Sequence, residues 1–173
     1  KLPTPLSGAC AARIGDRIYV AGGHGVESGS ATAAQRTFLM LGLNALREGW
    51  QSCEHWARPE RAYAVAAVQA GSFYLIGGAR AVDAQGAPVA AEHLHDSYRF
   101  APNSTGLAGT WQSLAITPFD ATGAASPGIA IGQSHIAVVP AMNSAAESSA
   151  GATPRVWWYH TITNTWTEGG ESP

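Results

Sequence analysis

The stretch that decides the fold runs Val68-Gln69-Ala70-Gly71-Ser72-Phe73-Tyr74-Leu75-Ile76-Gly77-Gly78. It reads as the end of one apolar strand, a tight turn, and a second buried strand that stops on a glycine pair. Two other stretches repeat this order: Arg13–Gly23 also ends on a glycine pair, and Ile131–Ala141 ends on Pro140-Ala141 instead. The chain therefore contains an internal repeat whose third copy is degenerate.

A tryptophan follows each of these stretches, at Trp50, Trp111 and Trp166. Gly22 and Gly77 are 55 residues apart, and so are Trp111 and Trp166. A period of about 50 residues is typical of kelch repeats, each of which is a four-stranded blade of a β-propeller. An antiparallel sandwich does not predict a glycine pair and a tryptophan recurring in one order. The sequence predicts an all-β fold, a kelch-type β-propeller with blades at approximately 5–56, 57–117 and 118–170.

The glycine pairs and the large aromatic side chains have different mechanical roles in this prediction. Strands crowd near the propeller axis, where a Cβ would clash or forbid the required φ. The space between blades widens outward and takes flat side chains such as Tyr98 and Trp111. Propellers close with typically about four to eight blades, so three would leave two apolar faces open. We expect the rest of a six-bladed ring from another chain, a longer parent protein or a second copy.

Composition argues against several classes of partner. The formal net charge of −2 at pH 7 disfavours nucleic acid or an anionic membrane held by charge alone. No run of about 18 apolar residues predicts a membrane-spanning helix. Cys10 and Cys53 fall on the first and last strands of one predicted blade, several strand spacings apart. We interpret both as small buried residues and not as a disulfide.

Three stretches carry a family resemblance: Arg61–Val65, Ile131–His135 and Tyr159–Trp166. Together they resemble the bacterial kelch mutarotases of the N-acetylneuraminate (sialic acid) epimerase family, particularly its cyclically permuted members. The resemblance runs over nearly the whole chain but over only about half of a six-bladed family member. It implies interconversion of the α and β anomers of sialic acid by general acid/base ring opening. It also implies a periplasmic location and neither a metal nor an organic cofactor.

The family carries its catalytic glutamate at a second-strand end, in a Gly-Glu…Pro-Gly-x-Arg motif. The three corresponding positions here read Gly22-Gly23-His24, Gly77-Gly78-Ala79 and Ala141-Met142-Asn143. By the permuted order of the family, the motif is expected just after Pro173. We therefore assign no catalytic residue within the chain, and we expect the chain alone to be inactive.

Two arginines are candidates for binding the carboxylate of a sugar acid. Arg61 begins the innermost strand of the second blade, where a guanidinium can grip a carboxylate through two hydrogen bonds. The alternative is an arginine that pairs with Glu60 or with a neighbouring blade. Arg80 lies just past Gly78, at the opposite end of a neighbouring strand or on the loop above it.

Two further residues on the first blade are weaker candidates for the same site. His24 follows Gly23 and can contact a sugar or carry a proton, unless it is a solvated loop histidine. Glu27 lies on the same loop and offers a carboxylate. The spacing of His93 and His95 resembles a metal pair, but no third ligand is placed by any spacing rule, so we predict no metal site.

Fold alone does not separate catalysis from binding, because propellers host both. The alternative hypothesis is therefore a non-catalytic kelch module that presents loops to a protein or a glycan. A copper radical oxidase is disfavoured, because the tyrosine–cysteine crosslink and ligand cluster that it needs cannot be assembled from this sequence.

Overall fold

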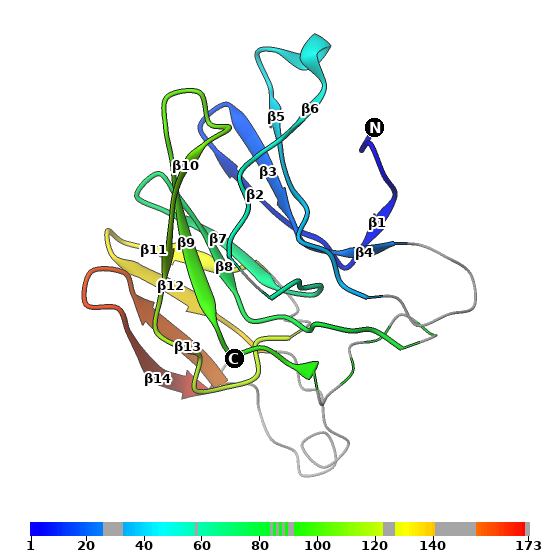
Figure 1. Ribbon diagram of the computed structural model, residues 1–173. Coiled ribbons are helices and arrows are strands. Elements are labelled where there is room, and N and C mark those ends of the chain that lie inside the picture. Colours follow the sequence, from blue (N-terminus) through cyan, green and yellow to red (C-terminus); the bar gives the residue numbers. More distant parts are fainter. Residues whose placement is uncertain are drawn as a thin grey trace.

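The computed structural model describes residues 1–25, 33–57, 59–83, 85, 87, 89, 92–122, 127–140 and 155–171. In these ranges the chain forms three four-stranded antiparallel sheets and one two-stranded sheet (Figure 1). None of the helices among the described residues is long and apolar enough to cross a membrane. The prediction of an all-β fold is confirmed.

The first blade follows the predicted order of short strands. Its strands are β2 (Cys10–Ile14), β3 (Arg17–Ala21), β5 (Phe38–Gly42) and β6 (Trp50–Ser52), paired in that order, with a 3-10 turn η1 (Leu46–Glu48) before β6. A separate pair, β1 (Leu6–Ser7) and β4 (His24–Gly25), lies at one end of this blade.

The second and third blades repeat the arrangement. The second contains β7 (Val65–Gln69), β8 (Ser72–Ile76), β9 (Ser97–Pro102) and β10 (Gly109–Ser113). The third contains β11 (Ile129–Ile131), β12 (His135–Val138), β13 (Arg155–His160) and β14 (Thr165–Glu171). Three four-stranded meanders confirm the kelch-type β-propeller, whereas the exact blade boundaries in the connecting segments stay predictions.

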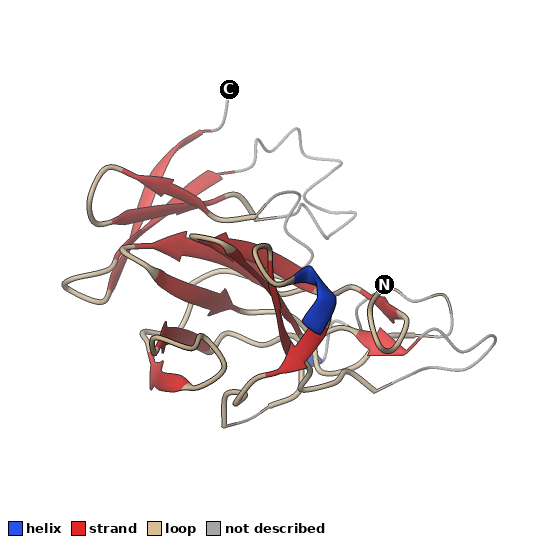
Figure 2. Cartoon of the chain, turned by 90° about the horizontal axis from the view of Figure 1, so that it is seen from above, coloured by secondary structure: helices blue, strands red, loops and turns tan. Residues whose placement is uncertain are grey.

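The blades pack face to face, with their first strands next to one another. β2 and β11 both contact β7, which places the first strand of each blade on the inner side of the arc. Figure 2 shows the sheets as successive layers when the chain is seen from above. This is the order that a propeller requires, because the first strand of every blade lines the central axis.

Aromatic side chains fill the space between the first two blades. Phe38 packs edge-on against Phe100 and Trp111, with ring centroids 5.1 Å apart in both cases. Tyr19 and Phe73 lie in the same cluster and have no exposed surface. The outward wedge between blades is therefore filled as the sequence predicts.

The second interface is built on the other face of the second blade. Tyr74 and Ile76 pack against Ile136 and Tyr159 of the third blade, and all four are buried. Because successive side chains of a strand point to opposite faces, Phe73 serves the first interface and Tyr74 the second. Both faces of the second blade are covered.

The two cysteines are free thiols, as the sequence suggests. Burial raises the pKa of Cys53 to about 11. Burial also raises the pKa of Cys10 to about 12, against the smaller opposing effect of the Arg61 charge. Both thiols therefore stay protonated at neutral pH, which makes them poor nucleophiles.

Candidate functional site

The glycine pairs that end β3 and β8 crowd against neighbouring backbone. A Cβ placed on Gly22 would lie 2.2 Å from the carbonyl oxygen of Arg61, and one on Gly78 would lie 2.7 Å from that of Ala62. Both glycines also have positive φ, +66° and +103°. The expected roles of these glycines, close approach and unusual φ, are confirmed. We call this end of the first two blades the glycine-pair end.

The chain that follows the second glycine pair joins several segments at this end. Ala79 bridges to Ala62 on one side and to His93 on the other. The amide of Ala34, from the first blade, donates to the carbonyl of Arg80 over 3.1 Å. Segments of two blades thus meet in one hydrogen-bonded patch at the glycine-pair end.

His93 and Asp120 form a contact across the glycine-pair end. Nδ1 of His93 lies against Oδ2 of Asp120, and the two side chains are 14% and 33% exposed. The other carboxylate oxygen of Asp120 accepts the backbone N–H of Thr122 over 2.8 Å. A half-buried imidazole is therefore held by a carboxylate that is itself held in place.

Arg61 is entirely buried and does not reach solvent in the described part of the chain. Its Nη2 pairs with Oδ2 of Asp96 at 2.7 Å, and its Nη1 donates to the carbonyl of Gly77 at 2.8 Å. Its guanidinium also lies 5.1 Å from the ring centroid of Tyr98. Of the two roles left open by the sequence, the structure supports the ion-paired one, with Asp96 as a partner.

This buried ion pair also affects Tyr98. Burial is the main cause that raises the pKa of Tyr98 to about 12, and a hydrogen bond and the negative charge of Asp96 add to it. The phenol therefore remains neutral at physiological pH. The Arg61–Asp96 pair holds the strand end together, and this placement does not favour a sugar contact by Arg61.

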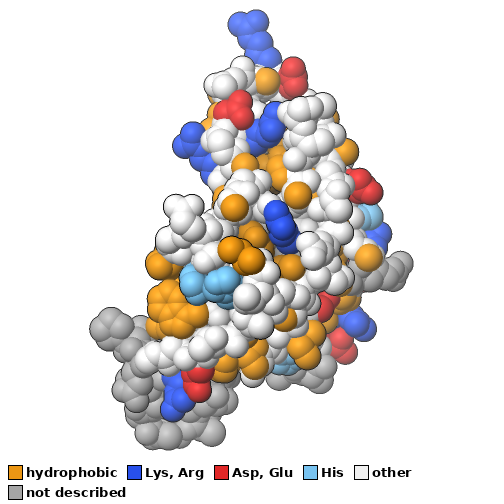
Figure 3. All heavy atoms as spheres, turned by 90° about the vertical axis from the view of Figure 1, so that its left-hand side faces the viewer, with side chains coloured by type: hydrophobic (Ala, Val, Ile, Leu, Met, Phe, Trp, Pro, Cys, Tyr) orange, Lys and Arg blue, Asp and Glu red, His pale blue; other side chains and the backbone are white. Residues whose placement is uncertain are grey.

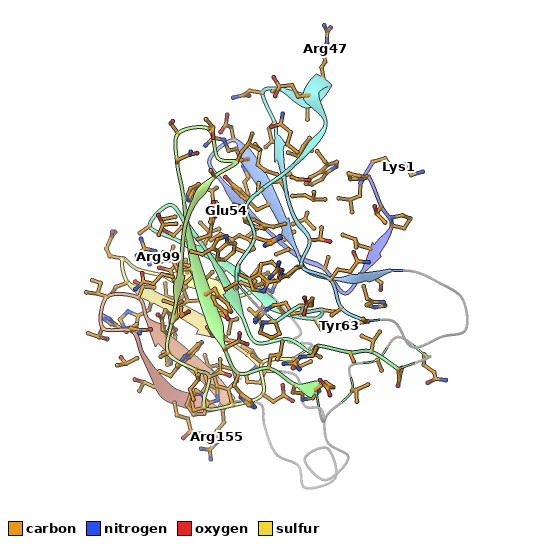
Figure 4. The ribbon with its side chains drawn as sticks, viewed as in Figure 1. Lys1, Arg47, Glu54, Tyr63, Arg99 and Arg155 are labelled. Atoms are coloured by element: carbon orange, nitrogen blue, oxygen red, sulfur yellow. The ribbon has the colours of Figure 1, made fainter. Side chains whose placement is uncertain are left out.

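His24 is buried beside a strained tyrosine. The His24 and Tyr63 rings are 5.9 Å apart between centroids, and Tyr63 has a φ of +57°, which is unusual for a bulky side chain. The Tyr63 amide donates to the carbonyl of Gly8 over 2.6 Å. Figure 4 labels Tyr63 in this region, far from Arg47 at the opposite end. Backbone strain of this kind clusters at functional sites.

Arg80 is an exposed cation of this region, and its side chain is 57% exposed. Its Nε lies 3.8 Å from a carboxylate oxygen of Glu92. Arg80 is therefore accessible to an anionic ligand, in contrast to Arg61. Glu27, the remaining candidate, lies outside the described residues.

A hollow lies on the face of the third blade that points away from the second blade. It has a volume of about 470 Å³ and is lined by Ile131, His135, Trp158, His160, Thr163, Thr165 and Thr167. His135 begins β12. Figure 3 looks onto the side where β11–β14 lie and shows histidine atoms beside hydrophobic ones. We call this surface the open face of the third blade.

Metal binding has no support in the described ranges, which contain no group of three His, Cys, Asp or Glu side chains placed to hold an ion. His95 instead packs its Nδ1 against the carbonyls of Thr117 and Phe119, at 3.2 and 3.1 Å. His93 and His95 therefore have separate surroundings, one facing a carboxylate and the other facing backbone.

The sequence analysis did not predict the contact between His93 and Asp120. The two residues are 27 positions apart, in different connecting segments. No spacing rule links such positions. The sequence carried only a partial signal: His93 was noted for its spacing from His95, and nothing in the sequence indicated Asp120.

The fold and the glycine-pair end define the class of this chain as part of a kelch-type β-propeller. In sequence, 77 residues, or 44% of the chain, are 34% identical to the N-acetylneuraminate epimerase of Vibrio cholerae, of which they cover 18%. The resemblance to the N-acetylneuraminate epimerase family seen in the sequence is thereby confirmed. No family profile matches the chain.

The fold is similar to that in a solved structure, "Structure of YjhT", with a TM-score of 0.65 and 16% sequence identity. The similarity covers 97% of this chain and 52% of that one. The chain therefore spans about half the length of the solved structure that it matches, and at this identity the likeness shows the fold alone.

Proposed function

We propose that this chain forms part of a sialic-acid mutarotase-like propeller, which interconverts the α and β anomers of N-acetylneuraminate by acid/base ring opening. The observation that carries the proposal is the 34% identity to an N-acetylneuraminate epimerase. The glycine-pair end supports it, because polar groups from two blades gather there around backbone that is too crowded for side chains.

The chemistry fits the groups that this end exposes. Ring opening needs a proton acceptor at the anomeric hydroxyl and a proton donor at the ring oxygen. A sialic acid also carries a carboxylate, which requires a cation to bind it. Arg80 is an exposed cation at this end, so we propose that Arg80 binds the carboxylate. We further propose that the glutamate of the family motif, on a blade outside this chain, is one of the acid/base groups.

The open face of the third blade supports the proposal that further blades complete the ring. Ile129 and Ile131 on the third blade are 52% and 43% exposed, whereas Ile136 on its opposite face is fully buried against the second blade. Light scattering is expected to give a mass well above 17.9 kDa. A stable lone monomer would contradict the proposal that further blades cover the open faces. The periplasmic location stays a prediction.

One-dimensional proton NMR of freshly released N-acetylneuraminate tests the function. Sialic acid released as one anomer is followed until its anomers reach equilibrium, with and without the assembled protein in which further blades cover both open faces. We expect the protein to shorten the equilibration time at equal pH and buffer concentration. An equilibration time equal to that in buffer would refute the mutarotase function.

A further inference from the structure

We infer that His93 and Asp120 form an acid/base pair in the sugar site at the glycine-pair end. His93 transfers the proton, and Asp120 positions the imidazole of His93. This inference rests on the proposed function and gives it a proton-transfer group within this chain. It differs from the expectation drawn from the family resemblance, which placed the catalytic carboxylate outside the chain.

The first support is the way His93 faces Asp120. A carboxylate only accepts hydrogen bonds, so Nδ1 of His93 carries the proton in the contact with Oδ2 of Asp120. In the neutral ring this leaves Nε2 unprotonated and able to accept a proton. A carboxylate on Nδ1 also stabilises the imidazolium that forms, which is its role in serine hydrolases.

The second support is that one glycine holds both halves of the pair. The carbonyl of Gly78 accepts the backbone N–H of Leu94 at 2.7 Å and the hydroxyl of Thr122 at 2.8 Å. Leu94 follows His93 directly, and Thr122 lies two residues after Asp120. Two segments that are distant in sequence are thereby fixed to the same oxygen.

Gly77 contributes the space for this arrangement. A Cβ on Gly77 would lie 2.7 Å from the Cβ of Ala121 and 3.2 Å from the carbonyl oxygen of Leu94. Ala121 is fully buried, so it cannot retreat toward solvent. The glycine pair that marks the kelch repeat thus also lets the segment carrying Asp120 approach the segment carrying His93.

The third support is that neighbouring ionisable groups are already engaged elsewhere. Asp96 is paired with buried Arg61, and His95 faces backbone carbonyls. Partial exposure distinguishes His93 from Arg61, which has none. His93 and Asp120 therefore combine a positioned imidazole with access from outside.

The proton balance of the reaction can be written with His93 as the carrier. Nε2 takes the proton of the anomeric hydroxyl, and the bond between the anomeric carbon and the ring oxygen breaks, its electron pair passing to that oxygen. The imidazolium then gives the same proton to the ring oxygen, which leaves the open-chain keto acid. The reverse steps on the other face of the carbonyl produce the other anomer.

The first part of the test measures access to Nε2 with diethyl pyrocarbonate, which modifies unprotonated imidazoles. Peptide mass spectrometry of the assembled protein follows the modification of His93, with exposed His55 as internal control. We expect N-acetylneuraminate to slow the modification of His93 at least several-fold and to leave that of His55 unchanged. Equal rates with and without the sugar would overturn the inference.

The second part measures anomer equilibration with three variants. His93→Gln is expected to lose about 100-fold or more of the acceleration, the typical contribution of general acid/base catalysis. Asp120→Asn is expected to lower kcat while leaving KM unchanged, because Asp120 acts through His93. His95→Gln, two residues away, is the matched control and is expected to retain the wild-type rate.

The outcomes separate this inference from the proposed function. If the wild-type protein accelerates equilibration and His93→Gln does so equally well, the function stands and the acid/base pair is refuted. If the wild-type protein does not accelerate it, both are refuted. Thermal unfolding of each variant identifies any loss of folding, and in that case His93→Asn replaces His93→Gln in the same assay.

Discussion

The open face of the third blade and the glycine-pair end of the first two blades are both accessible, but they are built differently. The open face contains a hollow of about 470 Å³, lined by Trp158, histidine, isoleucine and threonine side chains on a regular sheet. The glycine-pair end has polar side chains, among them those of Arg61 and Thr122, that donate to the carbonyls of Gly77 and Gly78. The difference shows that volume alone does not indicate the chemical site.

The covered face of the third blade indicates what the open face is for. There Tyr159 and Ile136 are buried against the second blade. The open face has no neighbouring blade among the described residues. The open face is therefore best interpreted as half of a contact between blades. Among the described residues, no covered surface corresponds to the glycine-pair end in this way.

The largest expected effect separates the two faces of one strand. Tyr159→Ala is expected to lower the free energy of unfolding by about 3–5 kcal/mol, because it removes a fully buried ring. Trp158→Ala, one residue earlier on the open face, is expected to cost less than half as much in the isolated chain. Urea unfolding measures both. Equal losses would mean that another chain already covers the open face.

The next comparison uses the two arginines that the sequence placed in one site. Arg61→Ala is expected to cost about 3 kcal/mol or more, because it leaves the carboxylate of Asp96 without its buried partner. Arg80→Ala is expected to change stability by less than about 0.5 kcal/mol, as an exposed charge does, but to weaken binding of the sugar acid. Chemical unfolding and sugar titration of both variants distinguish the roles. Similar losses of stability in the two variants would contradict the different roles assigned to Arg61 and Arg80.

A smaller effect tests the crowding at the glycine-pair end. Gly77→Ala is expected to cost about 2–4 kcal/mol, because its positive φ and the contact with Ala121 both disfavour a Cβ. Gly132→Ala is the control, since Gly132 also has positive φ but nothing within 4 Å of a Cβ. It is expected to cost about 1–2 kcal/mol. If the two variants unfold at the same urea concentration, crowding is not what selects the glycine pair.

The smallest expected effect concerns alkaline pH. Burial raises the pKa of Tyr159 to about 12, above the value of about 10 for an unfolded tyrosine. The folded chain therefore holds this proton more tightly, and the stabilisation is fully present below pH 10 and is lost as pH rises toward 12. Tyr159→Phe is expected to lessen the pH dependence of the free energy of unfolding in that window. An unchanged slope would contradict the assigned cause.

The sequence predicts the fold better than it predicts the site, for a physical reason. The strands, the glycine pairs and the aromatic wedge recur at one period, so each repeat supports the others. Site contacts do not recur with the repeat: Arg61 forms an ion pair with Asp96, which lies 35 positions away. His93 finds Asp120 through a loop that no repeat specifies.

The predicted roles of Arg61 and Arg80 illustrate the same limit. Both are arginines next to strand ends, and the sequence offers no way to tell which guanidinium is enclosed. In the structure Arg61 lies between Trp56 and Tyr98, whereas Arg80 lies on the connection between β8 and β9 with its side chain 57% exposed. Burial depends on side chains brought together by packing, and local sequence does not encode it.

The most direct test of the account is a map of amide chemical-shift changes in the isotope-labelled chain, within the assembled protein, on addition of N-acetylneuraminate. We predict that the largest changes lie at the glycine-pair end, in the amides of Gly23, Gly78, Arg80, His93 and Thr122. Changes confined to the open face of the third blade, around Trp158 and Thr165, would contradict this placement of the sugar site. The absence of any change at millimolar sugar would contradict the proposed function as well.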